Sequence, residues 1–194
     1  MFGLPKKIVI FDLECTTWEG AAARNWSLPG EHREVIQLGA VLVETEKFIE
    51  LDSVEFLVRP KINTVLSQYF INLTNIKQKE VDEKGVKFEI FLRNFFEFCS
   101  ETELYCFDKI DDSRLFDRDV LMENCKLYGI KFPFKMGRFH NINKVFFQHG
   151  VKIKQSGAAP KAFGIESAGP HHNALSDARG IVVGLRALGA SLNN

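Results

Sequence analysis

The stretch IVIFDLECTTWEG, residues 8–20, sets two acids at the end of an apolar run. The run from Ile8 to Phe11 predicts a buried β-strand at residues 6–12. Residues two apart on a strand share a face, so Asp12 and Glu14 point to one place. Their charges repel unless a cation binds, and hard divalent cations favour carboxylate oxygens. The pair therefore indicates half of a metal site, although acids at strand ends are also common without one.

The composition is that of an ordinary globular protein. The chain has 194 residues, of which 45% are hydrophobic and 26% charged, with a formal net charge of zero. We expect one domain over residues 1–194, with a core at about 7–190. No apolar stretch approaches the roughly 20 residues of a membrane helix, so we expect no membrane contact and a cytoplasmic location. The four cysteines form no CxxC pair, and we expect them to be reduced.

The hydrophobic pattern predicts strands first and then an alternation of helix and strand, which is typical of an α/β sheet layered with helices. Thr74 is a plausible N-terminal cap of the first helix, and Gly129 a stop for the third. The elements expected after the first strand are strands at 35–44 and 48–58, helices at 73–82 and 88–99, a strand at 103–107, a helix at 115–129, a strand within 131–139, and helices at 141–149 and 174–189.

A second group of polar residues lies near the end of the chain, in GPHHNALSDARG (169–180). His172 precedes Asp177 by five residues, which is about 140° of rotation on a helix. We therefore place His172 on a loop and Asp177 in the first turns of the last helix, from where both can reach one site. The alternative is an acid that stabilises a helix start and an exposed loop histidine.

FDLE (11–14) and HNALSDA (172–178) resemble the first and last motifs of the DEDDh 3′–5′ exonucleases of the DnaQ-like superfamily. The resemblance spans roughly residues 7–190 and is strongest to the Eri-like and KapD-like subgroup. It implies an RNase H-like (exonuclease) fold with a mixed central sheet and helices on both faces. Further stretches that carry it are EVIQLGAVLV (34–43), FLVRP (56–60), LTNIKQKEVD (73–82), the CTTWEG loop (15–20), residues 121–125 and YGIKFPF (128–134).

The family's middle motif supplies a third aspartate after the fourth strand. DRDVLMENC (117–125) aligns with the family pattern D-x-x-x-L-x-x-x-C and favours Asp117, with Asp112 as second choice. The family usually has Trp-Gly shortly before this aspartate, where this chain has Ser113 and Arg114. Phe107 and Phe116 are the candidates to replace that wall of the base pocket. The remaining acids of this region are Asp108, Asp111 and Asp119.

The resemblance implies two-metal-ion hydrolysis that removes nucleoside monophosphates from the 3′ end of RNA or single-stranded DNA, with a leaning toward RNA. Two Mg²⁺ or Mn²⁺ ions would hold the attacking and leaving oxygens. Histidine has an ordinary pKa of about 6.5, so His172 can act as general base at neutral pH, and the motif spacing makes His171 a bystander. The ions would be held by Asp12, Glu14, Asp117 and Asp177.

The resemblance also implies contacts to the terminal nucleotide. The backbone of Cys15, Thr16 and Thr17 would grip it together with His172, and Tyr69 and Leu73 would flank its base, although ordinary packing explains these two equally well. The rival function is a catalytically lapsed nucleic-acid-binding protein on the same fold; a plain interaction module is the remoter alternative. A protein partner or a homodimer is compatible with the sequence, which supports neither.

The charges are unevenly distributed along the chain. Between residues 131 and 165 there are seven basic residues and no acid. Such a run is usually a solvated face, but it also fits a groove that follows a phosphate backbone. With the resemblance, we expect the run to contact the strand upstream of the cleaved bond. The seven residues are Lys131, Lys135, Arg138, Lys144, Lys152, Lys154 and Lys161.

Overall fold

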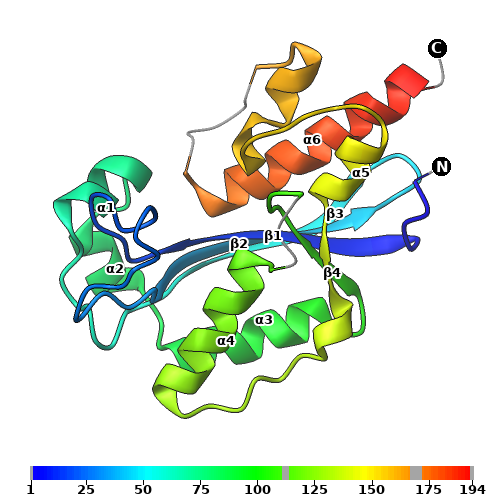
Figure 1. The fold of residues 1–194 in the computed structure, drawn as a ribbon. Coiled ribbons are helices and arrows are strands. Elements are labelled where there is room, and N and C mark those ends of the chain that lie inside the picture. Colours follow the sequence, from blue (N-terminus) through cyan, green and yellow to red (C-terminus); the bar gives the residue numbers. More distant parts are fainter. Residues whose placement is uncertain (1, 111–113, 167–171, 193–194) are drawn as a thin grey trace.

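A five-stranded mixed sheet forms the centre of the fold (Figure 1). The computed structural model describes residues 2–110, 114–166 and 172–192. The strand order is β3-β2-β1-β4-β5; the pairs β3–β2 and β2–β1 are antiparallel, and the pairs β1–β4 and β4–β5 are parallel. The predicted mixed sheet is confirmed. The strands are β1 (Lys7–Cys15), β2 (Val35–Glu44), β3 (Ile49–Leu57), β4 (Glu103–Cys106) and β5 (Phe139–Asn141).

Helices cover both faces of the sheet, as predicted (Figure 1). One face carries α3 (Phe88–Cys99) and α4 (Phe116–Tyr128), and the other carries α5 (Asn143–Gln148) and α6 (Ala174–Leu192). Within the described ranges, no helix has the length and apolarity needed to cross a membrane. The shorter helices are α1 (Gln68–Thr74), α2 (Gln78–Lys84) and the 3₁₀ turns η1 (Met136–Arg138), η2 (Ser156–Ala158) and η3 (Pro160–Phe163).

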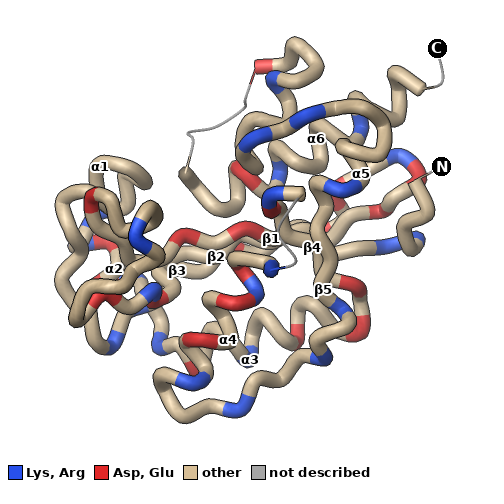
Figure 2. Tube along the Cα trace, viewed as in Figure 1, with Lys and Arg blue, Asp and Glu red and all other residues tan. Residues whose placement is uncertain are grey.

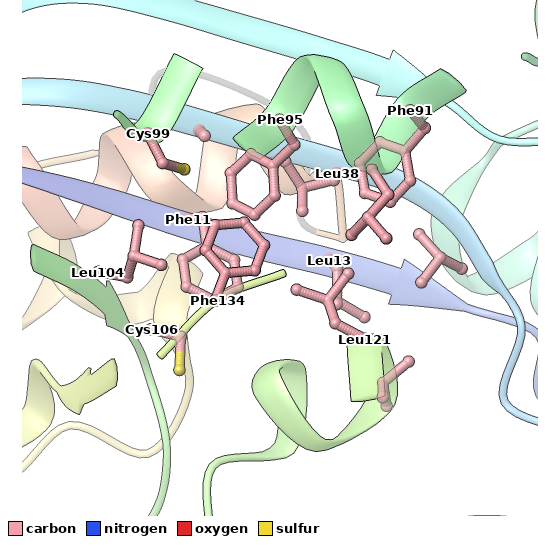
Figure 3. Packing of buried hydrophobic residues seen from close by; sticks show 14 of the residues in the cluster. Phe11, Leu13, Leu38, Phe91, Phe95, Cys99, Leu104, Cys106, Leu121 and Phe134 are labelled. Atoms are coloured by element: carbon pink, nitrogen blue, oxygen red, sulfur yellow. The ribbon is translucent and has the colours of Figure 1, made fainter. Parts of the chain in front are cut away.

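The central strand β1 is buried on both faces, and its two faces end differently. Phe11 and Leu13 pack into the core under α3 and α4, where Phe11 lies 5.5 Å from Phe95 between ring centroids (Figure 3). Ile8 and Ile10 belong to the other core, under α6. Because side chains alternate, Asp12 and Glu14 continue the face of Ile8 and Ile10. The acids thus lie where the apolar α6-facing row of β1 stops.

Helix α6 crosses this face with its first turn directly against β2. Gly39, which pairs with Asp12 across β1 and β2, makes this approach possible. A Cβ atom at Gly39 would lie 2.5 Å from the carbonyl carbon of Ala174 and closer still to the backbone of Leu175. The absence of a side chain at Gly39 therefore sets how near the start of α6 comes to the strand that carries Asp12.

The single helix predicted at 73–82 is wrong. The chain forms two short helices, α1 and α2, because Asn75 takes a left-handed conformation (φ 61°) that ends α1. Thr74 is the last residue of α1 and not a cap of its start; its hydroxyl donates to the Phe70 carbonyl at 2.9 Å. The start is capped instead by Ser67, whose side chain accepts from the Phe70 N–H at 3.0 Å.

The strand expected within 131–139 is displaced toward the C-terminus. Strand β5 covers only Phe139–Asn141, and the preceding residues pack their aromatic rings against the core under α3 rather than pairing with the sheet. Phe134 lies 5.2 Å from Phe96 and 5.6 Å from Phe95 between ring centroids. Aromatic burial thus replaces strand pairing in this segment.

Candidate active site

Three carboxylates from opposite ends of the chain meet on the α6-facing side of the sheet. Asp12, Glu14 and Asp177 each offer one oxygen within 4.8 Å of the others. Asp12 and Asp177 are 8% and 7% exposed, so neither is a solvated surface acid. The convergence predicted from FDLE and HNALSDA is therefore present in the fold.

Polar contacts hold the start of α6, and with it Asp177, in place. The side-chain oxygen of Asn173 accepts from the Ser176 N–H at 3.0 Å, as a cap of the helix start does. The side-chain oxygen of Gln37 on β2 accepts from the Ala174 N–H at 3.0 Å. These bonds and the close approach at Gly39 fix the first turn of α6 against the sheet.

His172 lies beside this cluster, on the approach to α6. Its Nδ1 is 3.9 Å from Oε1 of Glu14, and its side chain is 41% exposed. His172 has φ 59°, in the left-handed region that side chains other than glycine seldom adopt. Such a conformation persists only when the surroundings enforce it and is frequent at functional sites. His171 lies outside the described residues.

Asp117 lines the same cavity from the first turn of α4 and is 5% exposed. Asp108 positions this helix, since its Oδ2 accepts from the Phe116 N–H at 2.7 Å. Asp119 is turned away from the acid cluster and pairs with Arg118, at 2.6 Å from Nη2 to Oδ1. Asp111 and Asp112, the alternative choice for the third carboxylate, lie outside the described residues.

The electrostatics of the cluster are unfavourable without a cation. Burial raises the pKa of Asp12, and the nearby charge of Asp177 raises it further, while a hydrogen bond from the Ser156 side chain opposes the rise. Burial likewise raises the pKa of Glu14 and of Asp117, with repulsion from Asp12 as the next cause for both. Within the described part of the chain, no lysine or arginine forms an ion pair with Asp12, Glu14 or Asp117.

Buried carboxylate oxygens from Asp12, Glu14, Asp117 and Asp177, brought together in one cavity, are a fit donor set for a hard divalent cation. The cavity around it has a volume of about 270 Å³. The motifs gave no signal for three of its polar wall residues, Lys109, Gln155 and Ser156, because these lie in loops and turns between the motifs; Lys154 was expected only as part of the basic run. The wall is formed by Asp12, Leu13, Glu14, Phe107, Asp108, Lys109, Phe116, Asp117, Lys154, Gln155, Ser156, Gly157, His172 and Asp177.

Of the residues expected to contact the terminal nucleotide, His172 lines this cavity, whereas the other five do not. The Thr16 hydroxyl donates to the His32 carbonyl at 2.5 Å and accepts from the Glu34 N–H at 2.8 Å, so it braces the loop after β1. Tyr69 is 41% exposed and Leu73 is partly buried on α1. Contacts of Cys15, Thr16, Thr17, Tyr69 and Leu73 with a nucleotide stay predictions.

An aromatic wall stands next to the acids even though Trp-Gly is missing from its usual place. Phe107 and Phe116 both line the cavity, and Phe116 also lies 5.7 Å from Trp26 between ring centroids. The Arg33 guanidinium lies 5.3 Å from each of these two ring centroids. Of the two residues that stand in place of Trp-Gly, Ser113 lies outside the described residues. A stack built from the loop after β1 therefore reinforces Phe116.

The basic run 131–165 does not form one groove, so this expectation is wrong as stated. Arg138 is 8% exposed, and its Nη2 donates to the carbonyls of Ser100 and Thr102 at 2.6 and 2.5 Å, a structural role. The segment around Phe134 packs into the core under α3, whereas the segment around Ile153 packs into the core under α6. The run is therefore divided between the two sides of the sheet (Figure 2).

Comparisons with known proteins agree with this geometry. The sequence matches the model of the exonuclease (RNase T) family over residues 9–183. It is 31% identical to the probable 3′-5′ exonuclease KapD of Bacillus subtilis over 174 residues, which cover 88% of this chain and 78% of that protein. It is 28% identical to 3′-5′ exoribonuclease 1 of Rattus norvegicus over 183 residues, 90% of this chain but only 50% of that protein.

Solved structures of exonucleases also resemble this chain. The nuclease domain of 3′hExo, a DEDDh family member bound to rAMP, superposes with a TM-score of 0.76 at 26% identity and covers 95% of this chain and 92% of that one. An E. coli ExoI–ssDNA complex superposes with a TM-score of 0.69 at 12% identity over 97% of this chain and 41% of that one, a likeness of fold alone. The chain belongs to the RNase T family of DEDDh 3′–5′ exonucleases and has their DnaQ-like fold.

Proposed function

We propose that this chain is a divalent-metal-dependent 3′–5′ exonuclease that releases nucleoside monophosphates from the 3′ end of RNA or single-stranded DNA, with RNA preferred. The observation that carries the proposal is the meeting of Asp12, Glu14 and Asp177 within 4.8 Å beside His172. The chain spans half the length of the rat exoribonuclease, so activity and substrate are argued from the site itself.

Asp12, Glu14, Asp117 and Asp177 would hold two Mg²⁺ or Mn²⁺ ions. Bound there, the ions would neutralise buried negative charge and stabilise the charge that builds on a phosphodiester during attack. The protein contributes the spacing of the oxygens, which is set by the positions of β1, α4 and α6. Lys109 and Lys154, both at the cavity wall, attract the phosphate of the substrate.

His172 is placed to accept a proton from the attacking water. Its ring lies at the cavity wall beside Glu14 and keeps contact with solvent, through which the proton can leave. His172 takes its left-handed conformation just before the capped start of α6, and its Nδ1 lies 3.9 Å from Oε1 of Glu14. We propose His172 as the general base and the four carboxylates as metal ligands.

The preference for RNA rests on the relatives. The rat protein is named an exoribonuclease, and the superposed nuclease domain of 3′hExo binds rAMP. An enzyme distinguishes RNA from DNA through the 2′-hydroxyl group. We therefore expect faster turnover of RNA than of DNA of the same sequence.

The test is a panel of single- and double-stranded RNA and DNA 12-mers, each labelled at the 5′ end, incubated with Mg²⁺, Mn²⁺ or EDTA. We expect a ladder of products shortened from the 3′ end with either metal and none with EDTA. Asp12→Asn should abolish the ladder. Retained strand binding without any ladder would support the lapsed nucleic-acid-binding protein instead, and normal activity of Asp12→Asn would refute the site.

A further inference from the structure

A second cavity adjoins the one that holds the acids. It has a volume of about 390 Å³ and lies between the segment after β4 and the segment after α5. Lys109 and Lys154 belong to the walls of both cavities, so the two cavities are adjacent at these exposed side chains. A nucleic-acid strand whose 3′ end lies at the acid cluster can therefore extend into the second cavity. Its wall consists of Lys109, Ile110, Asn143, Phe147, Val151, Lys152, Ile153 and Lys154.

The charge of this wall differs from that of the other neighbouring cavity. Three exposed lysines line it, and the described wall residues include no acid. The other neighbouring cavity, of about 450 Å³, is lined by three acids and three bases, and Nε of one of these bases, Arg33, donates to Glu123 at 2.9 Å. A phosphate backbone is therefore attracted more strongly in the first cavity, whose described wall has three lysines and no acid, than in the second, whose charges cancel.

The wall also carries an exposed aromatic ring. Phe147 is 50% exposed, although the preceding Phe146 is fully buried under α6. An aromatic side chain on a basic surface is the pattern by which single strands are bound without regard to sequence, since each base can stack on it. Asn143 in the same wall is occupied structurally, because its Nδ2 donates to the Asp108 carbonyl at 2.9 Å.

We infer that this lysine groove, defined by Lys109, Lys152, Lys154 and Phe147, binds the nucleotides just upstream of the cleaved bond in a single-stranded substrate. The lysines contact phosphates, and Phe147 stacks on a base. The inference rests on the proposed exonuclease function and assigns the route by which the strand reaches the acids. It keeps Lys152 and Lys154 of the basic run 131–165 and adds Lys109 from the segment after β4 and Phe147 from α5.

The test compares a substrate that fills the groove with one that cannot. The long substrate is a 5′-fluorescein-labelled oligo(U) 10-mer, and the short one is the p-nitrophenyl ester of uridine 5′-monophosphate, which has no upstream nucleotide. Lys152→Gln and Phe147→Ala change residues of the groove that do not line the acid cavity. Lys131→Gln combined with Lys135→Gln is the matched control, two exposed lysines on the other side of the sheet.

For Phe147→Ala we expect kcat/KM for the 10-mer to fall about 5- to 100-fold, as loss of one stacked base predicts, with Phe147→Tyr near wild type. For Lys152→Gln we expect the slope of log binding constant against log salt to fall in magnitude by about 0.7. The ratio of 10-mer to ester turnover should drop for both variants and stay unchanged for the control pair.

An unchanged ratio in Phe147→Ala and Lys152→Gln would overturn the groove. An equal effect of the control pair would also overturn it, because the strand would then respond to the overall positive charge of the protein and not to the groove. Failure of the proposed exonuclease function can be distinguished from failure of the groove, because the wild-type protein would then hydrolyse neither substrate. In that case anisotropy of the labelled 10-mer, which needs no turnover, still decides whether Phe147→Ala and Lys152→Gln weaken strand binding.

Discussion

Asp12 is a buried acid near the end of β1, directly after the four apolar residues 8–11, and its burial destabilises the fold. Burial and the charge of Asp177 raise its pKa, so the ionised form is destabilised in the metal-free protein. Proteins keep such unfavourable groups where activity needs them. Asp12, Glu14 and Asp177 could be predicted from the sequence alone. Asp12 and Glu14 stand in a motif at the end of a strand, and Asp177 stands in a motif at the start of a helix.

We expect Asp12→Asn to stabilise the metal-free protein while abolishing turnover. A carboxyl with a raised pKa in the folded state contributes stability below about pH 4, where unfolded carboxyls are protonated, and loses it as pH rises through the folded pKa. At neutral pH in EDTA the amide should therefore add about 1 kcal/mol, or a rise in Tm of about 2–4 °C. Calorimetry at pH 4 and pH 7 checks this; a lower Tm at pH 7 would contradict it.

His172→Ala should lower kcat for nucleotide release by about 100-fold or more, because the attacking water loses its proton acceptor. Strand affinity, measured by anisotropy, should change little, since the metal ligands and the lysine groove remain. His171→Ala is the control that the motif spacing supplies and should stay near wild type. Equal losses in both variants would contradict the assignment of His172.

Asp117→Asn and Asp119→Asn form a matched pair on one helix turn. Asp117 lines the acid cavity, whereas Asp119 pairs with Arg118 outside it. We expect the first substitution to reduce the rate at least 100-fold by weakening the metal site, and the second to change it less than threefold. Initial rates at saturating Mn²⁺ measure both. A normal rate for Asp117→Asn would transfer the role to another acid of this region.

Among helices and strands, the approach of α6 to β2 decides whether the acids meet. The long helices and central strands were predictable because their apolar periodicity spans several turns or a complete strand. The division of 73–82 into α1 and α2 was not, because Ser67 and Asn75 act through local hydrogen bonds and a left-handed residue. The buried Glu34, which accepts from the N–H groups of Lys61 and Ile62, orders the segment before α1 through contacts distant in sequence.

Gly39→Ala should push α6 away from the sheet and move Asp177 relative to Asp12. An added Cβ meets backbone that cannot rotate away, so we expect a loss of about 2–4 kcal/mol in unfolding free energy and weaker Mn²⁺ binding. Gly180→Ala in α6 is the control, because an added Cβ at Gly180 would meet no atom of another segment closer than 3.6 Å. It should raise stability slightly. Chemical unfolding with Mn²⁺ titration checks both; unchanged Mn²⁺ affinity in a folded Gly39→Ala would contradict the positioning role.

At the scale of the whole molecule, the fold and not the order of residues in the sequence decides which charged side chains share a surface. The formal net charge is zero, and the seven bases of residues 131–165 end on both sides of the sheet. A linear count cannot show which lysines share a surface, because that depends on how the loops after β4 and α5 meet. The acids were predictable from motifs, whereas Ser156, Lys109 and the Trp26–Phe116 stack required the packed structure.

The most direct measurement is anomalous diffraction at the manganese edge from crystals soaked in Mn²⁺. We predict peaks at roughly 2 Å from carboxylate oxygens of Asp12, Glu14 and Asp177, with Asp117 completing the site. The same soak of Asp12→Asn should lose or weaken the peaks. Crystals whose peaks lie away from these four carboxylates, or which show none at an Mn²⁺ concentration that supports nucleotide release in solution, would contradict the account.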